Sequence, residues 1–214
     1  MMEIEQNFRR WSWMKHWHRT LVFDRRTRVL SEALAAQIPR QASVLDIGCG
    51  DGTIGSLITR LRPDIKVHGV EVMARPECKI PCRTFDGTTL PLADNSFDVC
   101  MLVDVLHHTE DARILLREAS RVSRSFVLIK DHLDENFLDN WTLRFMDWVG
   151  NRPHGVRLTY NYQSRSQWSS HFSECGLQET SWTTQIPLYT RPIHLVAGRG
   201  LHFISLLRKG GQRS

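Results

Sequence analysis

SVLDIGCGDGT, residues 43–53, is the stretch of sequence that decides the fold. An apolar run typical of a β-strand carries an acid near its end, glycines follow at 48, 50 and 52, and residues 54–61 have a helical pattern. Glycine has no Cβ and tolerates positive φ, so a ligand can lie directly against such a turn. The first N–H groups of the next helix face the same space. The stretch therefore predicts a nucleotide or nucleoside site in a doubly wound α/β fold.

Two details favour a nucleoside without phosphates. Residues 50–55 satisfy the dinucleotide pattern G-x-G-x-x-G, but the strand ends at Ile47 and the match begins only at the second glycine of the turn. Asp46 would also place a negative charge against a pyrophosphate, whereas it would attract an ammonium or sulfonium group in a partly buried cleft. S-adenosylmethionine (SAM) carries both of these cations and no phosphate.

The glycine turn resembles the first motif of class I SAM-dependent methyltransferases, D/E-x-G-x-G-x-G, which is filled here by Asp46, Gly48, Gly50 and Gly52. Glu71 ends a second short strand about 20 residues further on, where an acid meets ribose hydroxyls, although NAD enzymes share this feature. LPLADNSFD at 90–98, followed by VLHH at 105–108, is similar to the subfamily that contains the ubiquinone and menaquinone C-methylating enzymes.

This resemblance implies a SAM site, with S-adenosylhomocysteine as the product. In the family an Asp at the end of the third strand commonly accepts a hydrogen bond from the exocyclic amine of adenine, and Asp86 has that position here. The residues expected to bind the cofactor are Asp46, Gly48, Cys49, Gly50, Gly52, Glu71, Asp86, Gly87 and Asp104.

Strand and helix patterns alternate along most of the chain, which predicts a doubly wound α/β fold with helices on both faces of a sheet. The resemblance implies a Rossmann-like sheet of seven strands, mostly parallel, with the last strand antiparallel. Strands are expected at 43–47, 66–71, 82–86, 97–103, 125–131, 177–185 and 201–208, and helices at 20–38, 53–62, 110–123, 135–149 and 164–175. We expect one globular unit, divided into an N-terminal helical cap at 1–40, a SAM-binding domain at 41–214 and a substrate lid at 133–165.

Candidate catalytic residues follow the fourth and fifth strands, because ligands bind at the carboxyl ends of strands in open α/β sheets. An acceptor hydroxyl or acidic carbon must lose a proton during methylation, and a neutral imidazole can accept it near pH 7. The catalytic candidates are His132, His108 and Asp131. Structural roles remain open alternatives: His107 and His108 can shape the cofactor pocket, Asp131 and His132 can cap the next helix, and Asp104 can orient its loop.

The acceptor is expected to bind between the fifth strand and the following helix, where related enzymes build a lid. The substrate-binding candidates are Trp141, Arg144, Asn151, His154 and Tyr160. Trp141, Phe145 and Trp148 share one helix face, and packing of this face on the sheet is the favoured interpretation. The Trp-rich segment 8–18 predicts either a cap over the SAM site or a contact with a membrane interface.

Composition narrows the choice of partner and compartment. The 214 residues carry a net charge of +5, and a local basic excess near the N-terminus suits an anionic substrate or surface. Five cysteines, an odd number, indicate reduced thiols rather than a disulfide framework.

No metal site is expected, because Cys78-x-x-x-Cys82 lacks a second pair. No apolar run approaches 18 residues, so a soluble cytoplasmic protein is expected, and no RNA-binding module accompanies the aromatic and basic residues.

The resulting hypothesis is a SAM-dependent methyltransferase that acts at oxygen or carbon of a small-molecule or lipid-like acceptor. Two alternatives stay open at this point. A SAM-binding or regulatory domain without turnover would carry the same cofactor motifs, and an NAD-dependent oxidoreductase would share the glycine turn and Glu71.

Overall fold

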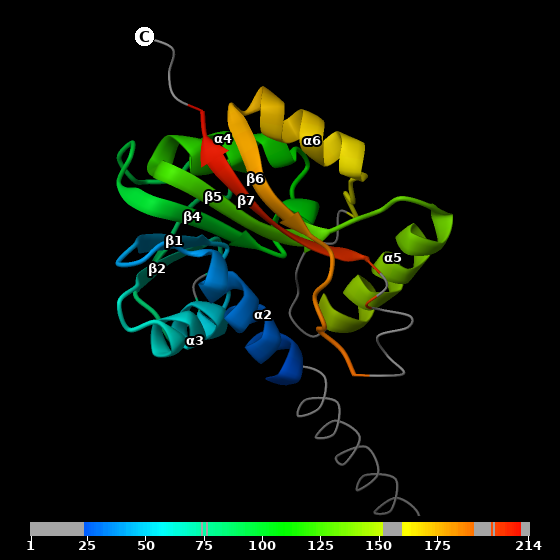
Figure 1. The fold of residues 1–214 in the computed structure, drawn as a ribbon, viewed down its shortest axis with the longest axis horizontal. Coiled ribbons are helices and arrows are strands. Elements are labelled where there is room, and N and C mark those ends of the chain that lie inside the picture. Colours follow the sequence, from blue (N-terminus) through cyan, green and yellow to red (C-terminus); the bar gives the residue numbers. More distant parts are fainter. Residues whose placement is uncertain are drawn as a thin grey trace, which may run out of the picture.

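A seven-stranded mixed sheet forms the centre of the molecule in the order β3-β2-β1-β4-β5-β7-β6 (Figure 1). The structure is a computed structural model, and it is described for residues 24–73, 75, 77–151, 160–190, 198 and 200–210. The strands are β1 (Ser43–Ile47), β2 (Lys66–Glu71), β3 (Cys82–Thr84), β4 (Phe97–Val103), β5 (Ser123–His132), β6 (Leu177–Thr183) and β7 (His202–Lys209). The helices are α2 (Arg25–Gln37), α3 (Thr53–Leu61), α4 (Ala112–Val122), α5 (Phe137–Asn151) and α6 (Arg165–Glu174), with a short 3-10 helix, η2 (Leu106–His108).

The strand directions confirm the predicted Rossmann-like sheet. β1 lies parallel to both β2 and β4, β2 is parallel to β3, and β4 is parallel to β5. β7 inserts between β5 and β6 and runs antiparallel to both. The order of the strands reverses between β1 and β4, and this switch point is where ligands bind in open α/β sheets.

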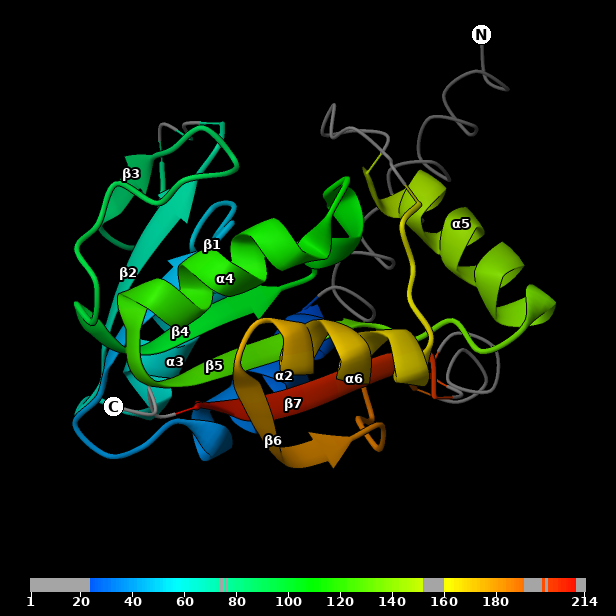
Figure 2. The same cartoon turned by 90° about the horizontal axis from the view of Figure 1, so that it is seen from above.

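Two helical layers cover the sheet (Figures 1 and 2). α2 and α3 pack on one face, where Leu30, Leu34 and Ile58 are fully buried against Val44 and its neighbours. α4 and α6 cover the other face, and their apolar side chains join a second core. Because both faces are covered, the central strands are apolar on both sides, which explains the nearly continuous hydrophobic run in β4.

α2 is an integral layer of this fold. It lies within the cap expected at residues 1–40, packs on α3 and contributes to the core beneath the sheet. Residues 1–23, which hold the Trp-rich segment, lie outside the described residues. Among the described helices, none combines the length and apolar character needed to cross a membrane.

α5 follows β5 and projects from the body of the sheet (Figure 2), and the aromatic side chains on one of its faces are exposed. Trp141 is 66% exposed, Phe145 54% and Trp148 47%. The interpretation that this face packs on the sheet is therefore wrong. The opposite face of α5 carries the buried Leu143, which packs with Tyr162 and Leu201 in a small separate cluster.

Candidate functional site

The glycine turn after β1 is held against β2 by its own backbone. The N–H groups of Gly48 and Cys49 donate to the carbonyl oxygen of Val70 at 2.8 and 3.2 Å. Gly48, Gly50 and Gly52 all have positive φ, at 72°, 59° and 72°. A Cβ on Gly48 would lie 2.6 Å from Val105, whereas a Cβ on Gly50 would meet no atom within 4 Å. The turn therefore exposes bare backbone at Gly50 to an open space.

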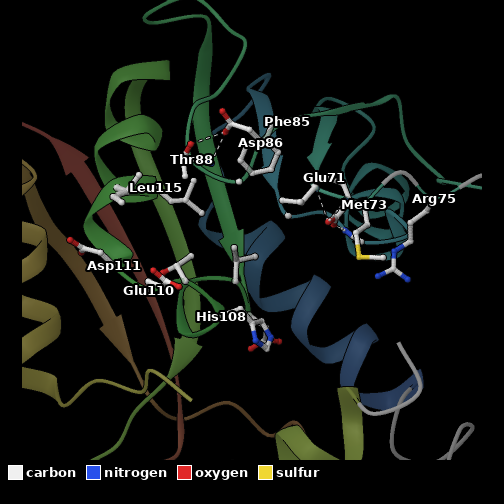
Figure 3. Close-up of a pocket in the computed structure, with 18 residues that line it drawn as sticks. Glu71, Met73, Arg75, Phe85, Asp86, Thr88, His108, Glu110, Asp111 and Leu115 are labelled. Atoms are coloured by element: carbon white, nitrogen blue, oxygen red, sulfur yellow. Dashed lines mark hydrogen bonds between the residues drawn. The ribbon is translucent and has the colours of Figure 1, made fainter. Parts of the chain in front are cut away.

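That space is a cavity of about 690 Å³ at the carboxyl ends of β1, β2 and β4 (Figure 3). Its lining comes from the glycine turn, the ends of β2 and β4, the segment after β3, and the start of α4. The lining residues are Gly48, Gly50, Glu71, Val72, Met73, Arg75, Phe85, Asp86, Gly87, Thr88, Asp104, Val105, His108, Thr109, Glu110, Asp111, Ile114 and Leu115. The cavity thus occupies the switch point of the sheet, and its size suits a nucleoside-sized ligand.

Two carboxylates at successive strand ends face this cavity (Figure 3). Glu71 accepts hydrogen bonds from the N–H groups of Gly50 at 2.7 Å and of Val72 at 2.9 Å. The Oδ1 atom of Asp86 accepts from the backbone of Thr88 and Thr89, each at 2.7 Å. These backbone bonds lower the pKa of Asp86, led by the bond from Thr89, so its carboxylate is charged and its orientation is fixed.

Asp104, at the end of β4, forms ion pairs with Arg26 of α2 and Lys130 of β5. Lys130 is completely buried in the sheet. Burial alone would raise the pKa of Asp104, but the cations of Lys130 and Arg26 hold it well below its ordinary value. A network of one carboxylate and two cations thus stabilises the floor of the cavity, and the charge on Asp104 is largely neutralised.

Behind this floor lies a buried cluster of histidines around Asp131. Asp131 accepts hydrogen bonds from His107 Nδ1 at 2.6 Å, from Leu106 N at 3.0 Å and from His132 N at 2.8 Å. His132 lies with its Nδ1 3.3 Å from that of His107. Burial, reinforced by the charges on Lys130 and His107, lowers the pKa of His132 to about 4. His132 is therefore a neutral imidazole at pH 7.

The structure brings together most of the predicted cofactor residues. Those that line the cavity are Gly48, Gly50, Glu71, Asp86, Gly87 and Asp104. Asp46, at the end of β1, and Cys49 and Gly52, within the glycine turn, are not among the lining residues. Asp46 is only 2% exposed, and burial, with a further contribution from Glu71, raises its pKa to about 7.

Of the catalytic candidates, only His108 lines the cavity. Its ring centroid lies 4.0 Å from that of His107, which connects it to the buried Asp131 and His132. Figure 3 shows the His108 ring across the cavity from Asp86. Asp131 binds the N–H at the start of η2, so its structural role concerns this 3-10 helix rather than a helix after β5.

The substrate candidates lie apart from the cavity lining. Trp141 is on the exposed face of α5, and the guanidinium of Arg144 lies over the Tyr160 ring, 4.5 Å from its centroid. Asn151 ends α5, and its side chain lies outside the described residues, as does the whole of His154.

Sequence reasoning missed Arg26 and Lys130. A charged residue at the end of the apolar run FVLI in β5 was a usable signal for Lys130, because a buried lysine requires a charged partner. No comparable signal marks Arg26, since its partner Asp104 is 78 positions away in the sequence.

A family model described as a methyltransferase domain matches residues 45–126, which is less than half of the chain. This segment includes the glycine turn, Glu71, Asp86 and the whole lining of the cavity. Residues 45–126 are therefore similar to this methyltransferase domain. The resemblance to methyltransferases, which use SAM as methyl donor, is thereby confirmed for this segment.

One curated relative is a 27-O-demethylrifamycin SV methyltransferase from Amycolatopsis mediterranei, 30% identical over 110 residues, with 44% of this chain and 40% of the relative covered. The chain thus spans less than half the length of the curated relatives it matches. Among solved structures, a putative methyltransferase of Haloferax volcanii in complex with its Trm112 activator has a TM-score of 0.65 at 15% identity, covering 92% of this chain and 93% of that one. The [4+2]-cyclase SpnF has a TM-score of 0.61 at 17% identity, covering 86% and 80%. These structural likenesses show the fold alone.

Proposed function

We propose that the protein is a cytoplasmic SAM-dependent methyltransferase that acts at oxygen or carbon of a small-molecule or lipid-like acceptor. The supporting observation is the cavity at the β1–β4 switch point, which has the glycine turn on one wall and the carboxylates of Glu71 and Asp86 at successive strand ends. Packing of the protein does not require this glycine turn and these two carboxylates at the strand ends, because the two hydrophobic cores lie on the faces of the sheet.

The residues around the cavity fit SAM in shape. Gly50 leaves room for a ligand against the backbone, since its missing Cβ would point into open space. Glu71 is oriented by backbone N–H groups and would accept from the ribose hydroxyls. Asp86 uses Oδ1 for its own turn, and within the described residues Oδ2 has no hydrogen-bond partner, so it would accept from the adenine amine.

The residues also fit SAM in charge. Five carboxylates and one guanidinium, that of Arg75, occur among the lining residues. Asp104 is paired with Arg26 and Lys130, and Asp111 with Arg113, but without these two the lining still carries more carboxylates than guanidinium groups. SAM carries a sulfonium and an ammonium against a single carboxylate, so an acidic cavity attracts it. Asp46 would act from behind the turn, where its pKa of about 7 would fall as a cation approaches, because a nearby positive charge favours the carboxylate.

When bound, SAM supplies a methyl group that its sulfonium already activates for in-line displacement. The chain must therefore align the acceptor and take up its proton. We assign to His108 the role of accepting the proton that the acceptor loses, because among the described lining residues it is the one that carries an imidazole. Asp131 and His132 would position His108 through His107, because they lie behind it and do not line the cavity.

The acceptor would approach along α5. The exposed aromatic face of this helix offers an apolar surface, and the Arg144–Tyr160 contact adds a cation beside it. The name of the Amycolatopsis relative specifies a demethylrifamycin, and this supports a bulky organic acceptor methylated at oxygen. Trp141, Arg144, Asn151, His154 and Tyr160 remain the candidates for binding it.

The test is calorimetry with SAM, S-adenosylhomocysteine and NAD, followed by transfer of labelled methyl groups from SAM to a cell extract. We expect binding of both adenosyl ligands and labelling of an extractable small molecule. Glu71→Gln should weaken SAM binding, whereas Glu32→Gln, an exposed carboxylate on α2, should not.

Each other outcome contradicts part of the proposal. Binding of NAD alone would indicate an oxidoreductase. Tight SAM binding without any labelled product across extracts would favour a SAM-binding domain without turnover.

A further inference from the structure

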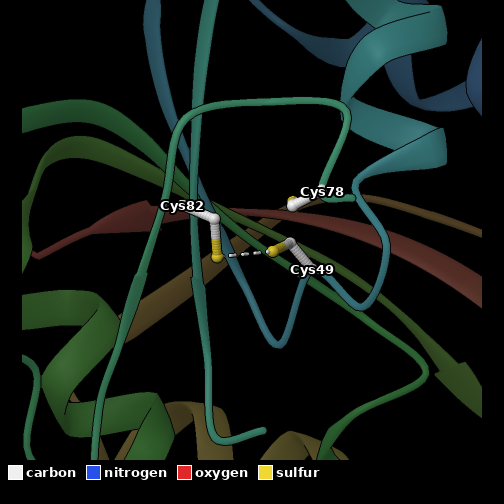
Figure 4. A group of neighbouring side chains, drawn as sticks. All are labelled: Cys49, Cys78 and Cys82. Carbon is white, nitrogen blue, oxygen red and sulfur yellow. Dashed lines mark hydrogen bonds between the residues drawn. The ribbon is translucent and has the colours of Figure 1, made fainter. Parts of the chain in front are cut away.

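Three cysteine side chains meet beside the glycine turn (Figure 4). Cys49 lies within the turn, Cys78 in the segment after β2, and Cys82 is the first residue of β3. The sulfur atoms of Cys49 and Cys82 are 3.4 Å apart, and all three sulfur atoms lie within 4.8 Å of one another. The spacing of Cys78 and Cys82 alone gave no reason to expect a metal site, but the fold supplies the third thiol.

The backbone fixes this arrangement on both sides. Lys79 N donates to Asp51 O at 2.9 Å, and Gly69 N donates to Pro81 O at 2.8 Å. These two bonds attach the segment that carries Cys78 and Cys82 to the glycine turn and to β2. The fold therefore holds the backbone positions from which the three thiols converge.

Two glycines leave the space that the thiols occupy. A Cβ on Gly69 would lie 2.4 Å from the sulfur of Cys49, and a Cβ on Gly52 would lie 3.0 Å from the sulfur of Cys78. Any other residue at these positions would push the sulfur atoms apart, so the local sequence permits the thiols to converge.

The sulfur spacing suits a small thiophilic ion. Zinc–sulfur bonds of about 2.3 Å in a tetrahedral site place sulfur atoms about 3.8 Å apart. The sulfur atoms of Cys49 and Cys82 are 3.4 Å apart and no pair of the three is further apart than 4.8 Å, so small side-chain shifts would reach this value. We propose that Cys49, Cys78 and Cys82 bind a thiophilic d10 cation of the Zn²⁺ or Cd²⁺ class, with water in the fourth position. β3 is the edge strand of the sheet, so water can reach the site.

The surrounding charges favour a cation. The carboxylates of Asp46 and Glu71 act on the thiols of Cys49 and Cys82 respectively. The ammonium of Lys79 lies 2.8 Å from Asp51, which compensates its charge. Burial raises the pKa of the Cys49 and Cys82 thiols, so an ion must displace their protons on binding, as thiolate coordination requires.

The site is placed to affect the cofactor. Cys49 lies between Gly48 and Gly50, both of which line the cavity, so an ion bound to its sulfur would fix the turn on which a ligand rests. We expect the affinity for SAM to differ between the metal-bound and metal-free protein. The metal site itself does not depend on methyltransferase activity.

The experiment is a titration of the full, reduced chain with Cd²⁺, and separately with Co²⁺. Thiolate ligands give a ligand-to-metal charge-transfer absorption in the ultraviolet, and native mass spectrometry should find one ion per chain. Cys78→Ser and Cys82→Ser should each lower the affinity by at least about tenfold, since even indirect ligand partners contribute that much. The matched control is Cys175→Ser, a cysteine at the end of α6, which should bind as the unaltered chain does.

Cys49 is left intact in these variants because it belongs to the turn beside the cavity. The thermal midpoint of each metal-free variant checks that it folds, and the two independent serine variants guard against misfolding of one. Absence of the charge-transfer band would overturn the proposal. Equal metal affinity in Cys78→Ser, Cys82→Ser and the control would also overturn it. The same holds if Cys49 and Cys82 form a disulfide and the protein binds no ion after this disulfide is reduced.

Discussion

Gly50 is the residue at which the cofactor proposal can be tested most directly. Its φ is 59°, and an added Cβ would enter the cavity. Gly176 is a matched control, because it has a φ of 67°, its Cβ would also meet nothing within 4 Å, and it lies outside the cavity lining. Replacing either glycine by alanine should cost about 1–2 kcal/mol of folding stability, the cost of the left-handed conformation.

Only Gly50→Ala should also weaken SAM binding, by at least about tenfold or 1.4 kcal/mol. Denaturant unfolding and calorimetry on the two variants separate these effects. Unchanged SAM affinity in Gly50→Ala would place the cofactor elsewhere, and an equal loss in Gly176→Ala would attribute the effect to general destabilisation.

The titration of His132 should make the free energy of unfolding depend on pH. Its pKa is lowered to about 4 in the folded chain, so the unfolded state binds more protons between that value and about 6.5. Stability should therefore be complete above pH 6.5 and fall as the pH drops, by about 3 kcal/mol from this group once pH 4 is reached. His202, whose pKa burial also lowers, adds to the same slope.

His132→Gln should reduce the steepness of this pH dependence, measured as the free energy of unfolding in denaturant from pH 7 to pH 4. His68→Gln, an exposed imidazole on β2, should leave the steepness unchanged. If both variants keep the original slope, His132 does not titrate as its burial indicates.

At the residue scale, the sequence located some residues of the site but could not predict their burial or their ion-pair partners. Glu71, Asp86 and Asp104 line one cavity because parallel strands end at one edge of the sheet, and their binding of the cofactor stays a prediction. The same rule could not decide that Asp46 is buried, since both faces of β1 are covered by helices. The partners of Lys130 were equally beyond reach, because ion pairs depend on which elements pack together.

At the scale of elements, α5 and α6 present tryptophans in opposite ways. Trp168 of α6 is fully buried and donates from Nε1 to the carbonyl of His132 at 3.1 Å, whereas Trp141 of α5 is mostly exposed. Trp168→Ala should cost about 3–5 kcal/mol of stability. Trp141→Ala should change stability by no more than about 0.5 kcal/mol, but it should raise the KM for the acceptor without changing the affinity for SAM.

Thermal and denaturant unfolding check the first difference, and steady-state kinetics check the second. A loss of stability in Trp141→Ala as large as that in Trp168→Ala would mean that the exposed face of α5 is covered in solution. The sequence could not distinguish these two helices, because aromatic residues at helical spacing look the same whether the partner surface is present or absent.

At the scale of the whole molecule, the periodicity of the sequence predicts the fold more completely than it predicts the site. Alternating strands and helices determined the doubly wound sheet, and the resemblance gave the antiparallel β7, both of which the topology confirms. The cysteine cluster did not follow, because Cys49 and Cys82 are 33 positions apart and meet only through the placement of β3 beside β2. Spacing along the chain detects ligands within one segment and overlooks those that neighbouring strands bring together.

Ligand binding should stabilise the molecule unevenly. SAM at about 100 times its dissociation constant should add about 2.7 kcal/mol to the free energy of unfolding. Hydrogen exchange should slow locally at residues 48–52, 71–73, 86–88 and 104–108, because these backbone segments border or support the cavity. α6 and β6 serve as internal controls, since none of their residues is part of its lining. Protection of these two elements with none at 86–88 would show that the ligand binds away from the switch point, even if the overall stabilisation were as large as expected.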